Sequence, residues 1–177
     1  MTTPQRRADA QSRLRKAHAT LVAARALVLL EPPLRDDAVN RASSAALQAA
    51  RALLDSQWAR ESQPGWDPSW RPGMPLPGQP KDPLCQEAVR RLLERFQMLA
   101  SSLGLAEDFT DYVRTLVEDG FDADVGELPE YDDEETRTAI STAETLVYMV
   151  AARIGLVDEL RSMPAPSLRP VLSSERP

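Results

Sequence analysis

DDAVNRASSAALQAARALLDSQ, the stretch from Asp36 to Gln57, decides the fold that we expect for this chain. It starts with two acids, which favour a helix start because carboxylates accept hydrogen bonds from first-turn amides and oppose the positive end of the helix dipole. It then continues for about six turns without Gly or Pro. Apolar residues recur at steps of three and four, the spacing of one helix face: Val39, Ala42, Ala46, Ala49 and Leu53.

This predicted helix is unusual because most of its side chains are small. The small residues are Ala42, Ser43, Ala45, Ala46, Ala49, Ala50 and Ala52. The distance between two packed helices depends on the side chains at their contact, so small ones let another backbone come close. We therefore expect residues 36–57 to form the central helix of a bundle.

A second helix is predicted before it, over about residues 6–30. One face carries Leu14, Ala17, Leu21, Ala24 and Val28, and Val22, Ala26 and Leu29 widen that face. Pro32 and Pro33 end this helix, since neither can donate to the preceding turn. A connection this short between two long helices predicts an antiparallel hairpin.

Three more helices are predicted after residue 82. The first starts at Asp82-Pro83, ends at Gly104 and buries Ala88, Leu92, Phe96, Leu99 and Leu103. The second covers about residues 106–119, with Phe109, Tyr112, Val113 and Leu116 inward. The last is capped within Asp132 to Glu135 and buries Ile140, Ala143, Leu146, Val147, Val150, Ala151 and Ile154. No stretch shows sustained strand-like alternation. The sequence predicts an all-α, antiparallel up-and-down bundle of about five helices, as one domain over residues 1–163.

Residues 58–82 form an insert in this domain that is rich in Pro and contains all three Trp residues, Trp58, Trp66 and Trp70. The rings can pin an irregular loop onto the bundle. Alternatively, the insert is a proline-rich recognition segment or a surface on which nucleobases stack. Residues 164–177 are expected to be a disordered tail.

The composition argues against several kinds of site. One Cys and one His exclude an internal disulfide and disfavour a zinc site within the chain. Cys85, in a first helical turn, has no basic group placed beside it by sequence and is expected to be inert. Asp122, Asp124 and Gly126 lack the spacing of a calcium loop. We expect no cofactor and no metal. The start of the chain is polar and basic rather than leader-like, and no segment predicts a membrane span, so we expect a cytoplasmic protein.

Charge is distributed unevenly along the chain. Residues 1–60 contain ten basic and five acidic side chains, a net charge of +5. Residues 105–135 contain thirteen acids and one Arg, a net charge of −12. Such a chain can pair head to tail with a second copy or bind a basic partner. The alternative is that these charges are solvated helix faces with no partner. The acidic half argues against broad RNA binding.

The order of these elements resembles the HEPN family of nucleotide-binding domains, and more narrowly the small stand-alone bacterial HEPN proteins. Two segments resemble that family: AVNRASSAALQAARALL at 38–54, and the stretch from Phe109 to Ile154, in which Ala123-Asp124 precedes an acidic loop and an Ala/Val-rich helix. Residues 84–96 fit the helix between them. The resemblance covers about residues 10–155 and implies an all-α dimer.

This chain also departs from the family pattern. Ser43 and Ser44 replace two tyrosines, Val125 replaces a third, and the 58–82 insert is longer than the usual loop. In active HEPN ribonucleases an Arg stabilises phosphate charge and a His acts as acid or base, with four to six residues between them. Here that spacing occurs at Arg13 and His18, on the first helix rather than late in the bundle.

The sequence leaves three functional hypotheses open. The resemblance implies a non-catalytic, dimeric binding or accessory partner, in a toxin–antitoxin or defence pair with a nucleotidyltransferase. The second hypothesis is a ribonuclease toxin that uses Arg13 and His18 across a two-fold interface. The third is an unrelated helical adaptor that binds through the 58–82 insert.

Overall fold

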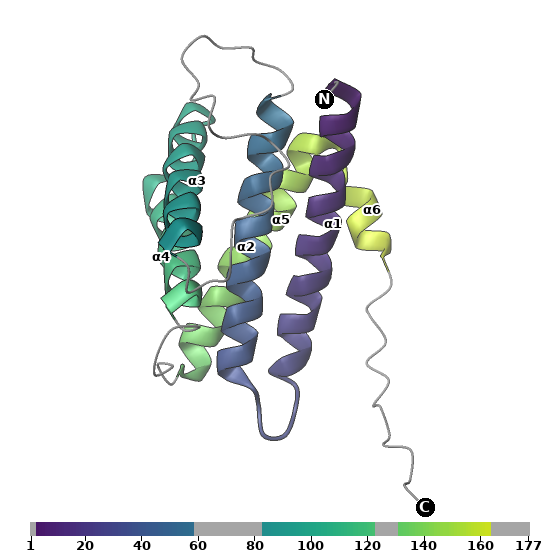
Figure 1. The fold of residues 1–177 in the computed structure, drawn as a ribbon. Coiled ribbons are helices and arrows are strands. Elements are labelled where there is room, and N and C mark those ends of the chain that lie inside the picture. The colour runs from purple at the N-terminus through teal and green to yellow at the C-terminus, as the bar shows by residue number, and fades with distance from the viewer. Residues whose placement is uncertain (1–2, 59–82, 123–130, 164–177) are drawn as a thin grey trace, which may run out of the picture.

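The fold is a bundle of helices, seen in a computed structural model that describes residues 3–58, 83–122 and 131–163. Within these ranges there are six helices and no strand: α1 (Thr3–Leu27), α2 (Arg35–Trp58), α3 (Pro83–Ser102), α4 (Glu107–Asp122), α5 (Asp133–Ile154) and α6 (Val157–Ser162) (Figure 1). The all-α prediction is confirmed. The 58–82 insert beyond Trp58, the 123–130 segment and the 164–177 tail lie outside the described residues.

Helix α2 lies at the centre of the bundle and contacts α1, α3, α4 and α5. The small residues Ala42, Ala46 and Ala49 are completely buried, together with Ala45, Ala50 and Ala52. Helix α1 packs antiparallel along α2, and α5 lies behind both (Figure 1). The prediction that the alanine-rich segment is the central helix is therefore confirmed.

Helices α2 and α4 approach each other closely at Ser43 and Gly120. A Cβ atom added to Gly120 would lie only 2.1 Å from the Ser43 Oγ and 2.4 Å from the Ser43 Cβ. Both distances are far shorter than a van der Waals contact between these atoms. Glycine at 120 and a small residue at 43 are thus both required at this helix crossing.

The ends of the last two helices follow from local side chains. Asp132 caps α5 by accepting hydrogen bonds from the amides of Glu134 and Glu135, and Glu135 accepts one in return from the Asp132 amide. This capping box confirms the predicted start. Gly155 ends α5 with φ of 74°, a left-handed conformation that glycine adopts without strain. The chain then forms α6, a helix that the sequence analysis did not predict.

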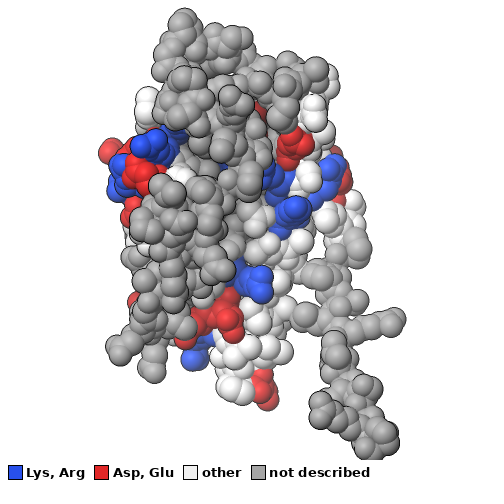
Figure 2. Space-filling view, viewed as in Figure 1, with Lys and Arg blue, Asp and Glu red and all other residues white. Residues whose placement is uncertain are grey.

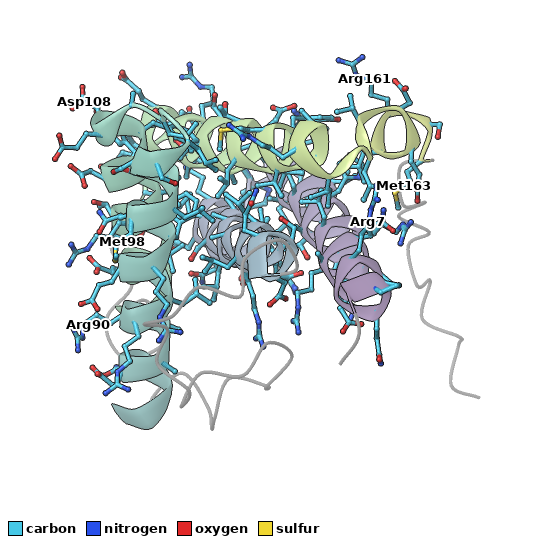
Figure 3. All side chains as sticks on the ribbon, turned by 90° about the horizontal axis from the view of Figure 1, so that it is seen from above. Arg7, Arg90, Met98, Asp108, Arg161 and Met163 are labelled. Atoms are coloured by element: carbon cyan, nitrogen blue, oxygen red, sulfur yellow. The ribbon has the colours of Figure 1, made fainter. Side chains whose placement is uncertain are left out.

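Helix α6 contacts α5 and is joined to α1 by an ion pair. There the Arg15 guanidinium donates to Glu159 over 2.5 Å, and Leu160 is buried. Figure 3, seen from above, shows Arg161 and Met163 on this side of the bundle, with Arg7 of α1 close by, whereas Met98 and Arg90 of α3 lie on the opposite side. A six-residue helix is too short to show a helical period, which is why the pattern analysis missed it.

Two predicted core residues are exposed, so those predictions were wrong. Leu29 is 81% exposed because α1 ends at Leu27, three residues earlier than expected. Tyr112 is 61% exposed because the buried stripe of α4 runs through Val113, Leu116 and Val117 instead. The remaining predicted core positions are buried or partly buried, including the complete stripe of α5.

Candidate functional site

Arg13, the first of the two candidate catalytic residues, is held by an acid of the central helix. Its Nε donates to the Asp55 Oδ2 over 2.9 Å, from α1 to α2. Asp55 is only 2% exposed, and Arg51 is buried beside it. Burial raises the pKa of Asp55, and this effect outweighs the opposing attraction of Arg13 and Arg51. Arg13 therefore neutralises an acid inside the bundle.

His18, the second candidate, lies on a different side of α1, against α5. It is 7% exposed, and its ring meets the Tyr148 ring edge-on with centroids 6.1 Å apart. Burial lowers the pKa of His18; the charge of Arg25 lowers it further, and Glu144 acts in the opposite direction. Arg25 and Glu144 form an ion pair across α1 and α5, and His18 packs next to that pair.

The structure does not bring Arg13 and His18 together at one surface. Five residues along an α-helix correspond to a rotation of about 140°, so the two side chains leave α1 in different directions. One bonds to α2 and the other packs on α5. The arrangement gives each residue a contact within the bundle.

Other basic side chains of the N-terminal half are also paired with distant acids. Arg15 bonds to Glu159 of α6, Arg25 pairs with Glu144 of α5, and Arg35 donates to Asp133 over 2.6 Å. Figure 2 accordingly shows Lys and Arg side chains interspersed with Asp and Glu on one face of the molecule. The positive charge of residues 1–60 is partly neutralised by ion pairs within the protein.

A cleft of about 510 Å³ lies between α4 and α5. Its apolar lining comes from Val39, Leu116 and Ala139, and three threonines add hydroxyl groups. Its acidic lining residues are Asp119, Asp132, Glu134 and Glu135, and its two aromatic residues are Tyr112 and Tyr131. No Lys or Arg is among the described residues that line it. Val39 and Leu116 are only 1% and 7% exposed, so the accessible part of this lining is mostly polar and acidic.

Tyr131 connects this cleft to a second hollow of about 400 Å³. The second hollow is lined by Pro33, Leu34, Arg35, Asp36, Asp37 and Tyr131, at the turn between α1 and α2. The Tyr131 amide donates to the Asp36 Oδ1 over 3.4 Å. Burial raises the pKa of the Tyr131 hydroxyl, and the carboxylates of Asp119, Asp36 and Glu135 raise it further. Acids from α2, α4 and α5 thus converge around one tyrosine.

This cleft was not predicted from the sequence, although two patterns in the sequence point to its walls. Tyr112, Leu116 and Asp119 recur at steps of four and three, which places them on one face of α4. Glu135, Thr138 and Thr142 do the same on α5. A helix face on which acidic residues recur beside aromatic or hydroxyl groups could have suggested that α4 and α5 form the walls of the cleft. Their pairing depends on how α4 and α5 pack on α2, which the local patterns do not specify.

Comparisons with known proteins give no further assignment. No protein-family model matches the chain, and neither a curated protein nor a solved structure shows significant similarity to it. Among the described residues, no group of three His, Cys, Asp or Glu side chains could hold a metal ion. No helix in the described part is long and apolar enough to cross a membrane.

Proposed function

We propose that this chain is a non-catalytic, HEPN-like helical protein that works as a binding or accessory partner. The observation that carries the proposal is the placement of Arg13 and His18. A ribonuclease of this type needs a histidine that exchanges protons with RNA and an arginine that is free to meet phosphate charge. Here Arg13 bonds to Asp55, and the His18 ring is buried against Tyr148.

The proposal extends to a homodimer that acts beside a nucleotidyltransferase in a toxin–antitoxin or defence pair. This part rests on the resemblance of residues 38–54 and 109–154 to HEPN proteins. The small residues of α2 are covered by α1, α4 and α5 within one chain. A dimer would therefore form through another surface of the bundle.

An RNA-cleavage assay tests the central claim. The purified chain is incubated with a mixture of structured and single-stranded RNAs, alongside His18→Gln and Arg13→Lys variants whose helical content is checked by circular dichroism. We expect no cleavage by any of the three and no growth arrest on expression. Cleavage by the unmodified chain that disappears in His18→Gln would overturn the proposal in favour of the ribonuclease.

Light scattering tests the dimer separately. We expect a mass near twice that of the 19.6 kDa chain at micromolar concentration. A monomer across the whole concentration range would remove the dimer from the proposal while leaving the non-catalytic role unaffected.

A further inference from the structure

We propose that the outward face of the second half of α1 packs against the same face of a second copy of this chain, with the two helices antiparallel. This inference deepens the proposed homodimer, and rests on it, by naming the contact surface and the orientation of the two copies. Three observations support it: a second apolar stripe on α1, the exposure of that stripe, and the match between its two halves.

Helix α1 carries apolar residues on two opposite faces in its second half. Arg25 is the only Lys, Arg, Asp or Glu between Ala17 and Leu30. One face is buried in the bundle through Leu21 and Ala24. A surface helix normally carries polar residues on the opposite face, but here apolar residues continue there. They recur at alternating steps of three and four, the spacing of a seam between two helices, and we call them the outer seam: Ala19, Val22, Ala26 and Leu29.

The outer seam faces away from the core of the bundle. Within the described part of the chain, Leu27 packs against the hydrophobic core, whereas Val22 and Ala26 are partly exposed and do not. Leu29 is 81% exposed, and Leu30, at 43%, extends the apolar surface. On the face shown in Figure 2, the lower part of α1 and the turn below it are largely free of charged side chains. The outer seam is therefore an apolar surface that a second helix can cover.

The turn after α1 holds the last residue of the seam in place. The Leu29 amide donates to the Ala26 carbonyl over 3.2 Å, and the Leu34 amide donates to the Leu27 carbonyl over 3.2 Å. A side chain on a backbone that is already ordered loses less conformational freedom on binding. Leu29 can thus contact a partner without a prior rearrangement of the turn.

The outer seam is complementary to itself when two copies run antiparallel. A two-fold axis near Ala24 places Ala19 opposite the partner's Leu29, because both lie five residues from the axis. The same axis places Val22 opposite the partner's Ala26, two residues away on either side. Each layer then combines a larger and a smaller side chain, which lets the two helices interdigitate closely.

Charges near the ends of the seam favour the antiparallel orientation. Lys16 lies just before the seam and Glu31 just after it, and both are exposed. An antiparallel pair brings each Lys16 toward the partner's Glu31, whereas a parallel pair brings like charges together. Arg25, beside the seam, is ion-paired with Glu144 of its own chain. It therefore adds no uncompensated positive charge to the contact.

Sedimentation equilibrium on the full chain tests the surface with a matched pair of variants. Ala19 is an exposed alanine of α1 within the outer seam, and Ala152 is an exposed alanine of α5 outside it. Neither substitution by glutamate buries a charge within one chain, and circular dichroism checks that helical content is kept. Ala19→Glu places two carboxylates in the apolar contact and should weaken dimerisation by about tenfold or more. Ala152→Glu should leave it unchanged.

Disulfide formation between engineered cysteines tests the orientation. Ala19→Cys and Leu29→Cys chains, each carrying Cys85→Ser, are oxidised separately and as a mixture. We expect a disulfide between the two different chains. Two chains that both carry Ala19→Cys should not join, because in the antiparallel pair their cysteines lie about 15 Å apart along the helix axis, too far for a disulfide.

Three results would overturn the proposal: a monomer at every concentration, equal effects of Ala19→Glu and Ala152→Glu, and a disulfide between two Ala19→Cys chains, which would show a parallel pair. A dimer that both glutamate variants leave intact would refute this surface while the homodimer of the proposed function stands. RNA cleavage that depends on His18 would instead contradict the non-catalytic role. The two failures are therefore distinguishable.

Discussion

Replacing Gly120 by alanine tests the close contact between α4 and α2. The new methyl group would lie 2.1 Å from Oγ and 2.4 Å from Cβ of Ser43, so the two helices would have to move apart. Overpacking of a buried contact costs about 1–3 kcal/mol, and an alanine in place of glycine inside a helix returns up to about 1 kcal/mol. Because the methyl group overlaps two atoms, we expect Gly120→Ala to lower the free energy of unfolding by about 2 kcal/mol.

Urea unfolding followed by circular dichroism measures this change at one fixed protein concentration. A second substitution at position 43 identifies the cause. Ser43→Gly removes both overlapping atoms and should restore most of the lost stability in the Gly120→Ala background. Ser43→Ala removes only Oγ and leaves the Cβ overlap of 2.4 Å, so it should restore little. Ser44→Gly, at the neighbouring exposed position of α2, measures the cost of the extra glycine alone.

Either of two results would show that α2 and α4 are not in tight contact through the Ser43 Cβ. If Gly120→Ala stabilises the protein, the gain in helix propensity exceeds the steric cost and the helices are not in tight contact there. If Ser43→Ala restores stability as fully as Ser43→Gly, then Cβ is not the obstructing atom, and the α2–α4 spacing differs from the one described.

Three further predictions, on two buried charged or titratable residues and one helix cap, are tested by the same unfolding assay. Asp55→Ala should lower the free energy of unfolding by about 3 kcal/mol, because it leaves the Arg13 and Arg51 guanidinium groups near each other without this buried acid. Glu94→Ala removes an exposed ion pair and is the control; it should cost less than about 1 kcal/mol. Burial lowers the pKa of His18, so the unfolded chain binds a proton at this residue more readily than the folded chain does. The free energy of unfolding should therefore fall as the pH drops below about 6.5, and His18→Gln should reduce that pH dependence. Asp132→Ala should cost about 1 kcal/mol by removing the N-cap of α5.

The helices could be predicted because each buries a regular stripe of apolar residues. Ile140, Val147 and Ile154 follow that spacing along α5, and all are buried. The start at Asp132 and the end of α3 near Gly104 were also predictable, since caps and left-handed glycines are local signals. Ends that depend on tertiary packing were not: α1 ends at Leu27 although apolar residues continue to Leu30.

The placement of Tyr112 and of the cleft could not be predicted because both depend on how the helices pack. Tyr112 lies one turn before Leu116, so the periodicity alone indicates burial. In the bundle, the inward side of α4 is filled by Val113 and Val117, which turns Tyr112 toward the cleft. A residue at the edge of an apolar stripe becomes buried or exposed according to the neighbouring helix, and that information is not local.

The ion pairs of the folded chain show why the net charge of a sequence segment is an incomplete guide to its binding partners. Residues 1–60 sum to +5, yet folding pairs Arg15, Arg25 and Arg35 with acids that lie about a hundred residues or more away. Those pairs remove positive charge from the surface at the N-terminal half. The acids around Tyr131 instead gather from three helices at a cleft with no described basic lining. The net charge of a sequence segment therefore does not predict how much of that charge remains unpaired at the surface after folding.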